Sequence, residues 1–84
     1  MLITFKDQST LYYTPASGIR IILSNKDTYT AVDKVPDLTQ YTYFNYSIKE
    51  HLDGYYIMTI YASHEKSNLQ VVYQSFRAKF STSL

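Results

Sequence analysis

The dipeptide Asp53-Gly54 stands between two alternating runs of apolar and polar residues. Asp-Gly in this setting is the strongest short-range signal for a β-hairpin, because a type I′ turn needs positive φ at both central residues. A two-residue loop of this kind pairs Leu52 with Tyr55, and the register of the flanking strands then follows by counting. The sequence therefore predicts an antiparallel hairpin in the second half of the chain.

A second hairpin through residues 64–68 can add residues 69–80 as a third strand, with Tyr61 opposite Val72 and Thr59 opposite Gln74. This three-stranded meander has two faces, because successive side chains on a strand point to opposite sides. In the counted register the core face carries Phe44, Tyr46, Ile48, Leu52, Tyr55, Ile57, Tyr61, Val72, Phe76 and Phe80. The opposite face carries Tyr56, Met58, Ile60, Val71 and Tyr73, with polar residues on the outer strands.

Residues 67–80 also fit a helix, which leaves an α+β fold as an alternative. Five apolar residues of this segment recur at helical spacing, and Ser67 is suited to the N-cap of such a helix. Adjacent Val71 and Val72 argue mildly against it, because β-branched side chains lose rotamer freedom in helices. The strand is the favoured interpretation.

The first half of the chain predicts further short strands at 2–6, 10–14, 18–24 and 28–32. A loop follows at 33–37, since Pro36 restricts the residue before it and cannot donate to a strand ladder. The expected fold is an all-β domain spanning residues 1–84: a small antiparallel β-sandwich that ends in the meander.

A chain of 84 residues buries roughly 60–65% of its unfolded surface, so its stability is marginal unless something supplements the core. There is no cysteine to form a disulfide or a metal cluster. Self-association or docking on a partner protein is the remaining common supplement, so a homo-oligomer is possible.

An apolar centre with polar flanks is typical of a docking surface. The same meander face also fits a core covered by the N-terminal strands, and the sequence leaves both interpretations open. Tyrosine is the unusual residue, at ten copies, and its ring and hydroxyl suit interfaces. The candidate interface residues are Tyr41, Tyr43, Tyr56, Met58, Ile60 and Tyr73.

The charge balance, 8 Lys+Arg against 7 Asp+Glu, gives a formal charge of +1. Nucleic acid is not expected as the main ligand, because phosphate binding normally needs a concentrated basic face. No stretch approaches the ~20 apolar residues of a membrane span, and no signal peptide is evident at the N-terminus. The expected location is a virion or the host cytoplasm, with no membrane insertion and no secretion by a signal of its own.

The sequence contains few residues in arrangements that are typical of catalytic sites. His51 and His64 belong to different turns, and the Ser63-x-x-Lys66 spacing lacks its companion motifs. There is no glycine-rich phosphate loop, and sugar binding normally adds tryptophan, of which there is none. We therefore expect no enzyme activity, no catalytic residue, no metal and no cofactor.

The Tyr/Thr/Ser-rich texture without cysteine, together with hairpins such as "KEHLDGYYIMTIYA", resembles small tail-associated proteins of tailed bacteriophages of Gram-positive hosts. Those are similar in fold to the N-terminal shoulder domain of lactococcal phage receptor-binding proteins. The chain lacks the repetitive neck and sugar-binding head that follow that domain. The resemblance implies anchoring or assembly, with a partner that is the chain itself or another particle protein. Alternatives from other classes are a small effector that inhibits a host protein and a carbohydrate-binding module.

Overall fold

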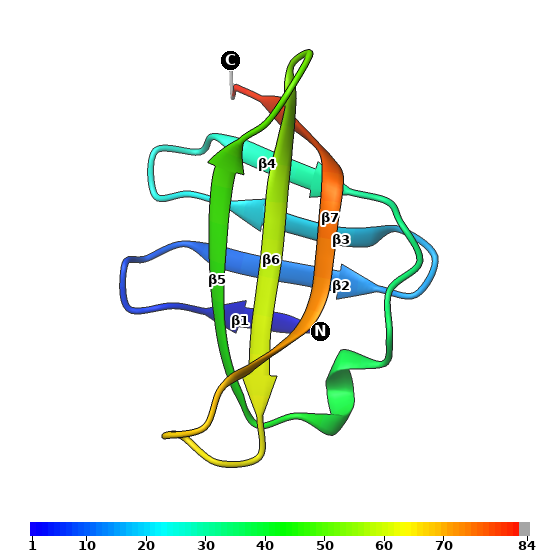
Figure 1. The fold of residues 1–84 in the computed structure, drawn as a ribbon. Coiled ribbons are helices and arrows are strands. Elements are labelled where there is room, and N and C mark those ends of the chain that lie inside the picture. The colour runs from blue at the N-terminus through cyan, green and yellow to red at the C-terminus, as the bar shows by residue number, and fades with distance from the viewer. Residues whose placement is uncertain (83–84) are drawn as a thin grey trace.

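A computed structural model describes residues 1–82 as seven β-strands and one short 3-10 helix. The elements are β1 (Leu2–Thr4), β2 (Thr10–Thr14), β3 (Gly18–Ile22), β4 (Thr28–Ala31), η1 (Leu38–Gln40), β5 (Tyr43–Glu50), β6 (Tyr55–Ser63) and β7 (Gln70–Ser81). All pairings are antiparallel, in one sheet of order β1-β2-β3-β4-β7-β6-β5 (Figure 1). The expected all-β class is confirmed, including the four N-terminal strands.

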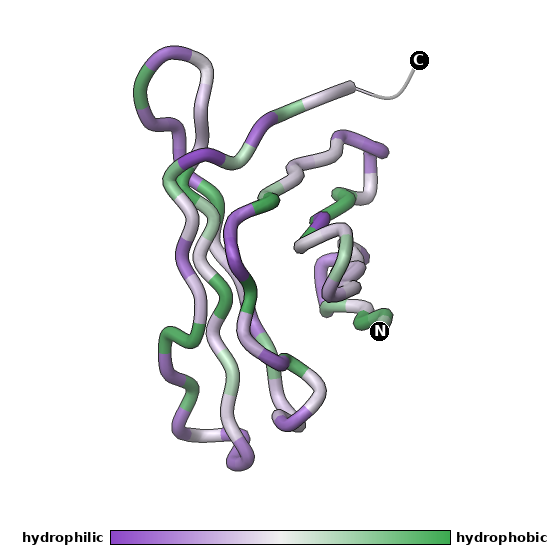
Figure 2. The backbone as a smooth tube through the Cα atoms, turned by 90° about the vertical axis from the view of Figure 1, so that its right-hand side faces the viewer, coloured by the Kyte–Doolittle hydropathy of each residue, from purple (hydrophilic) through white to green (hydrophobic). Residues whose placement is uncertain are grey.

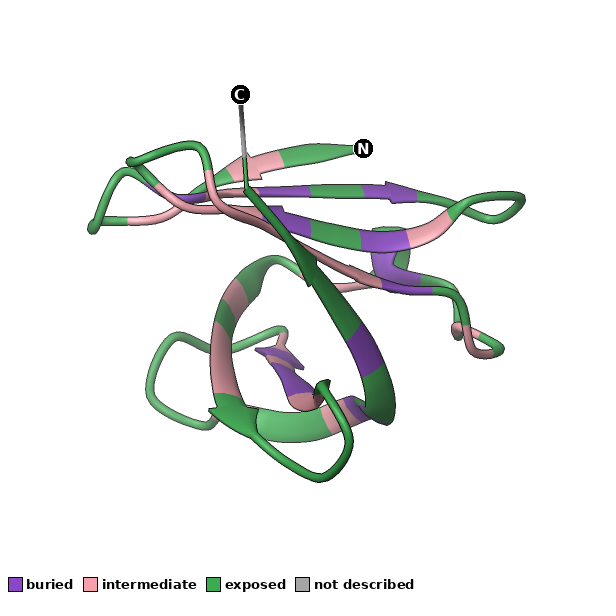
Figure 3. Ribbon diagram, turned by 90° about the horizontal axis from the view of Figure 1, so that it is seen from above, coloured by how far each residue is buried: buried purple, intermediate pink, exposed green. Residues whose placement is uncertain are grey.

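The single sheet folds over on itself to give two layers. The N-terminal layer (β1–β4) crosses the direction of the meander layer (β5–β7), so the packing is close to orthogonal (Figure 1). Figures 2 and 3 show the two layers face to face from the side and from above. β7 joins them, since its last residues pair with β4 and its earlier residues pair with β6. Two register irregularities between β6 and β7 accompany this bend.

Turn chemistry explains the hairpins of the N-terminal layer. Gly18 has φ of 81°, and a Cβ placed there would lie 2.3 Å from the carbonyl oxygen of Ala31 on β4, so only glycine fits. In the β3–β4 turn the side chain of Asn25 accepts a hydrogen bond of 3.0 Å from the backbone N–H of Asp27. β1 and β3 are shorter than the predicted strands 2–6 and 18–24. They end at Thr4 and Ile22, because tight turns begin there.

The core lies between the two layers. Its fully buried apolar residues come from both layers and from η1: Leu11, Ile19, Ile21, Ala31, Leu38, Met58, Ile60 and Ala78. Leu38 reaches this core because Asp37 caps η1, its side chain accepting a hydrogen bond of 3.0 Å from the backbone N–H of Thr39. This hydrogen bonding with Thr39 lowers the pKa of Asp37 below its ordinary value.

The predicted register of the β5–β6 hairpin is wrong by one residue. Asp53 and Gly54 do have positive φ, as expected, and the N–H of Tyr55 bonds to the carbonyl of Leu52. The next bond, however, runs from the N–H of His51 to the carbonyl of Tyr55 at 2.9 Å, so one residue of the first strand has no partner opposite it. Ile48 therefore lies opposite Met58 instead of Thr59 along the hairpin.

This shift exchanges the faces of β6 relative to β5. Tyr56, Met58 and Ile60 now share the inner face with Tyr46 and Ile48 and point toward the N-terminal layer. In the β6–β7 pairing the predicted Thr59–Gln74 pair is confirmed, whereas Tyr61 lies opposite Val71 and Tyr55 opposite Lys79 because of the two irregularities.

The helical alternative for residues 67–80 is wrong. Residues 70–81 form β7, the longest strand of the sheet. Residues of the supposed helical stripe lie on both sides of that strand: Tyr73 is buried in the core and Phe80 packs on the same inner side against Tyr29, while Phe76 is exposed on the outer side. Tertiary pairing with both β4 and β6 overrides the helical spacing.

Two polar contacts fasten loops to the layers. Asp7, in the β1–β2 turn, accepts hydrogen bonds from the hydroxyl of buried Ser9 and, at 2.7 Å, from the hydroxyl of Tyr46 on β5. These hydrogen bonds, that of Ser9 first, lower the pKa of the Asp7 carboxyl. Asp33, in the loop after β4, accepts a bond of 2.6 Å from the hydroxyl of Ser75 on β7.

Candidate interaction surface

Most of the predicted anchor residues lie in the core. Met58 and Ile60 are fully buried, and Tyr73 is 6% exposed. Tyr56 is half-buried, with its ring centroid 5.0 Å from that of Tyr29 on β4. The N-terminal layer covers these residues, so their assignment to an exposed docking face is wrong, and the interpretation of this face as core is correct.

The remaining two candidates lie at the other end of β5. Tyr43 is 40% exposed at the first position of that strand. Tyr41 is half-buried, its ring 6.5 Å from Phe44 and 5.6 Å from His64 between centroids. Tyr43 is thus free to contact another molecule, whereas the ring of Tyr41 packs against its own chain.

The outward face of the meander carries Ile57, Tyr61 and Phe76, which the predicted register had assigned to the core, together with Val71, which it had assigned to the opposite face. Val71 is 56% exposed and Phe76 47% exposed on β7, and the half-buried Ile57 and Tyr61 lie next to them on β6. We call these four residues the outer meander patch. The alternation of apolar residues along β6 and β7 is the signal for this patch, but the predicted register turned three of its four members inward.

Polar residues surround the outer meander patch. Lys49 and Asn45 project from the neighbouring edge strand β5, and both are exposed. Between the patch residues on β6, Thr59 is covered by Gln74, whose side-chain amide donates to the Thr59 hydroxyl at 3.0 Å. His51 lies with its ring 5.4 Å from that of Phe76. An apolar centre within a polar rim is the usual anatomy of a protein–protein interface.

The residues with catalytic potential have structural roles or lie apart. Ser63 shares its hydroxyl with the backbone of Glu65 in the β6–β7 turn, accepting from the N–H at 3.1 Å and donating to the carbonyl. This is a turn motif that accounts for the serine without a nucleophilic role. Within residues 1–82 there is no group of three or more His, Cys, Asp or Glu residues placed to hold a metal ion.

One buried polar atom of the core has no partner. The Tyr73 hydroxyl accepts or donates no hydrogen bond among the described residues. Burial raises the pKa of Tyr73; the nearby Ser75 hydroxyl opposes this shift, although the two groups do not meet in hydrogen-bond geometry. A buried hydroxyl without a partner costs stability, because it loses its hydrogen bonds to water on folding.

Comparison with protein-family models, with curated proteins and with solved structures gave no match to this chain. In the part of the chain that the structure describes, no helix is long and apolar enough to cross a membrane. The functional argument therefore rests on the surface itself.

Proposed function

We propose that this chain is a non-enzymatic interaction module that docks on another protein through the outer meander patch. The observation that carries the proposal is the exposure of Val71 and Phe76 on the outward face of the three-stranded meander. Exposed large apolar side chains are removed from water when a partner covers them, which favours association. The polar rim leaves this face soluble when it is free.

The proposed setting is a bacteriophage particle, in which the chain acts as a tail or adsorption-apparatus accessory protein. The resemblance in residue texture and hairpins to such proteins supports this setting, and so does the all-β fold that the resemblance implies. The partner is then another particle protein or a second copy of the chain. Docking would then use the sheet face or a strand edge, as in β-strand addition.

The test is a pull-down with tagged protein from infected and uninfected host lysates, read by mass spectrometry. The variant Phe76→Asp places a charge in the outer meander patch, and Thr4→Asp places the same charge on the exposed face of β1 as a matched control. Circular dichroism confirms that both variants are folded before they are used. We expect wild type and Thr4→Asp to recover tail proteins from infected cells only, and Phe76→Asp to lose them.

Two outcomes would contradict this proposal in different ways. Recovery of one host protein from both lysates, lost with Phe76→Asp, would keep the surface and replace the particle role with inhibition of a host protein. Equal recovery by Phe76→Asp and wild type would remove the surface. Size-exclusion chromatography with light scattering separates a second copy from a different partner, because a dimer that Phe76→Asp dissolves identifies the chain as its own partner.

A further inference from the structure

A row of side chains crosses five strands on the outside of the molecule. The pairings place Tyr12 on β2 opposite Arg20 on β3, Arg20 opposite Thr30 on β4, Thr30 opposite Lys79 on β7, and Lys79 opposite Tyr55 on β6. Directly paired positions share a face of the sheet, so all five side chains project outward. We call this set the cross-strand row. Residues far apart in the sequence are adjacent in it.

The two cations of the row lie over its two aromatic rings. The guanidinium carbon of Arg20 is 5.5 Å from the centre of the Tyr12 ring, and the ammonium of Lys79 is 5.3 Å from that of Tyr55. Both cationic residues are exposed, and Tyr12 is 38% exposed. Each cation lies over the face of a ring, and this pairing occurs at both ends of the row, so aromatic surface and positive charge occur together there.

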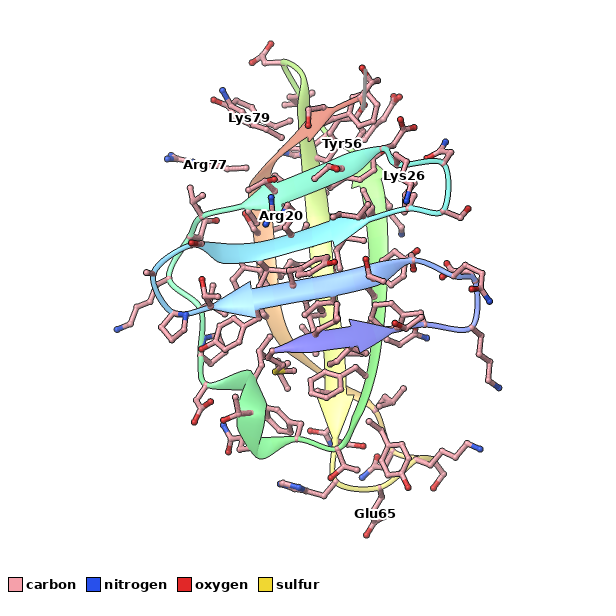
Figure 4. All side chains as sticks on the ribbon, turned by 180° about the vertical axis from the view of Figure 1, so that it is seen from behind. Arg20, Lys26, Tyr56, Glu65, Arg77 and Lys79 are labelled. Carbon is pink, nitrogen blue, oxygen red and sulfur yellow. The ribbon has the colours of Figure 1, made fainter. Side chains whose placement is uncertain are left out.

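The fold also segregates charge in a way that the net charge of +1 conceals. β1, β2, β3, β4 and β7 are consecutive in the sheet and contain no Asp or Glu. They contain three cations, Arg20, Arg77 and Lys79, and Figure 4 shows the latter two projecting from the same side of the molecule. The acidic residues lie in turns and loops, apart from Glu50 at the end of β5.

A shallow groove runs along one end of the row. It has a volume of about 370 Å³ and is lined by Leu2, Tyr12, Thr14, Ser17, Arg20 and Thr30, among others. Hydroxyl groups and the Arg20 guanidinium lie on its walls, so it offers hydrogen bonds to a polar ring that rests beside Tyr12. The groove and the row form one continuous surface, which adjoins the outer meander patch at Tyr55, since Ile57 is the next outward residue of β6.

We propose that the cross-strand row binds a single strand of nucleic acid. Arg20, Lys79 and Arg77 would contact successive phosphates, while Tyr12 and Tyr55 would stack on bases, the combination that sequence-tolerant single-strand binding uses. Four steps between adjacent strands span about 19 Å along the sheet, which suits a site of about four nucleotides. A protein partner is disfavoured for this surface because its centre is cationic and threonine-lined instead of apolar.

The first measurement is fluorescence anisotropy of a labelled oligothymidine of about fifteen nucleotides, titrated with wild-type protein at low salt. Three phosphate contacts predict that the logarithm of the binding constant falls with that of salt concentration with a slope of about −2. Inorganic polyphosphate serves as competitor, since it supplies charge without rings. We expect it to compete at least tenfold more weakly per phosphate; equal competition would overturn the role of the tyrosines.

Substitutions distinguish binding at the cross-strand row from nonspecific attraction between the oligonucleotide and positive charge elsewhere on the protein. Arg20→Gln and Lys79→Gln each remove one cation and are expected to weaken binding several-fold and reduce the salt slope by about 0.7, the share of one phosphate. Lys66→Gln removes the same charge from the exposed β6–β7 turn and is expected to have no effect. An equal effect of Lys66→Gln, or no saturable binding at protein concentrations up to hundreds of micromolar, would overturn the proposal.

Two substitutions of Tyr12 test whether its ring stacks on a base. Tyr12→Phe keeps the aromatic face and is expected to bind as wild type does, whereas Tyr12→Leu is expected to weaken binding about fivefold or more. If the two variants bind equally, Tyr12 does not stack on a base. Phe76→Ser removes the apolar ring without adding a charge beside Arg77, so loss of protein partners with retained oligonucleotide binding would leave the two proposals independent.

Discussion

The outer faces of the two layers differ, although both layers obey the same alternation of side chains. The N-terminal layer turns threonines outward at Thr4, Thr10, Thr28 and Thr30, and its exposed apolar side chains Leu2 and Tyr12 lie together on β1 and β2. The meander layer instead turns Ile57, Tyr61, Val71 and Phe76 outward. Threonine also suits such strand positions, so the four apolar residues on the outer face of the meander support the proposed contact with another molecule.

The largest expected effect is the loss of stability when a charge is placed on the inner face of the meander, which the outer face should tolerate. Met58→Asp buries a carboxylate among Leu11, Ile21 and the rest of the core, with no partner for its charge. We expect a loss of more than about 4 kcal/mol in the free energy of unfolding, which is enough to unfold a small domain. The measurement is circular dichroism during thermal unfolding.

The control is Phe76→Asp, the same charge on the outer face of the same layer. The free energy of unfolding of this variant is expected to lie within about 1 kcal/mol of the wild-type value, because Phe76 is half exposed. A folded, cooperative Met58→Asp domain would mean that the N-terminal layer does not cover this face and that the comparison of the two faces is wrong.

A second prediction concerns the contact that fastens the N-terminal layer to β5. Asp7→Ala removes the acceptor for Ser9 and Tyr46, and we expect a loss of about 1 kcal/mol, moderated because Asp7 is exposed. Urea unfolding of the variant and of wild type measures this difference. The control Asp27→Ala removes a carboxylate of the β3–β4 turn that does not join the layers.

The effect of Asp7 depends on pH in a defined direction. Its pKa in the folded protein is lowered from an ordinary value of 3.8, so the folded state binds the proton less readily than the unfolded state. The stabilisation is present above pH 3.8 and is lost as the pH falls through the folded pKa. The difference between wild type and Asp7→Ala is expected to shrink in acid; a constant difference would show that the charge does not matter.

A third and smaller effect concerns the unpartnered hydroxyl of the core. Tyr73→Phe removes that hydroxyl and keeps the ring, so we expect no loss of stability and a gain of up to about 1 kcal/mol. Urea unfolding of the two proteins gives the sign. A loss of stability would show that the hydroxyl has a partner, for example a buried water.

The smallest expected effect on stability comes from a substitution that gives the outer face of the meander a threonine, as on the N-terminal layer. Val71→Thr replaces an exposed apolar residue by the residue that the other layer uses, and we expect a change within about 0.5 kcal/mol in unfolding free energy. Binding of the protein partner should weaken while stability does not, which isothermal titration against the isolated partner would detect. A large loss of stability would instead make Val71 part of the fold.

Most strands and turns could be predicted from the sequence, because they depend on residues that are close together in the chain. Alternation at a period of two residues predicts β2 and β6, and Asp53-Gly54 predicts the turn between β5 and β6. Threonine, tyrosine and isoleucine also favour strands over helices, which is why the all-β class could be predicted. The short helix η1 was not, because it depends on one Asp37 cap and on a place for Leu38 in the core.

The candidate site could not be predicted because it depends on departures from the counted register in both hairpins of the meander. Once the N–H of His51 bonds to the carbonyl of Tyr55, every partner along β5 and β6 moves by one position, and β6 exchanges its faces relative to β5. The two irregularities between β6 and β7 then place Val71 and Phe76 beside the outward residues of β6. Both faces of β6 are apolar enough to form a core, so composition does not choose between them. Only the packing of the N-terminal layer against Met58 and Ile60 does.

The sequence by itself determined that this chain forms short antiparallel strands, where most of them turn, and that it holds surplus aromatic surface. The tertiary structure decided which of that surface is buried and brought Tyr12, Arg20, Lys79 and Tyr55 into one row. The physical reason is that strand formation and tight turns depend on neighbours in the chain. Register, layer contacts and charge clusters depend instead on residues that only the closed sheet makes adjacent.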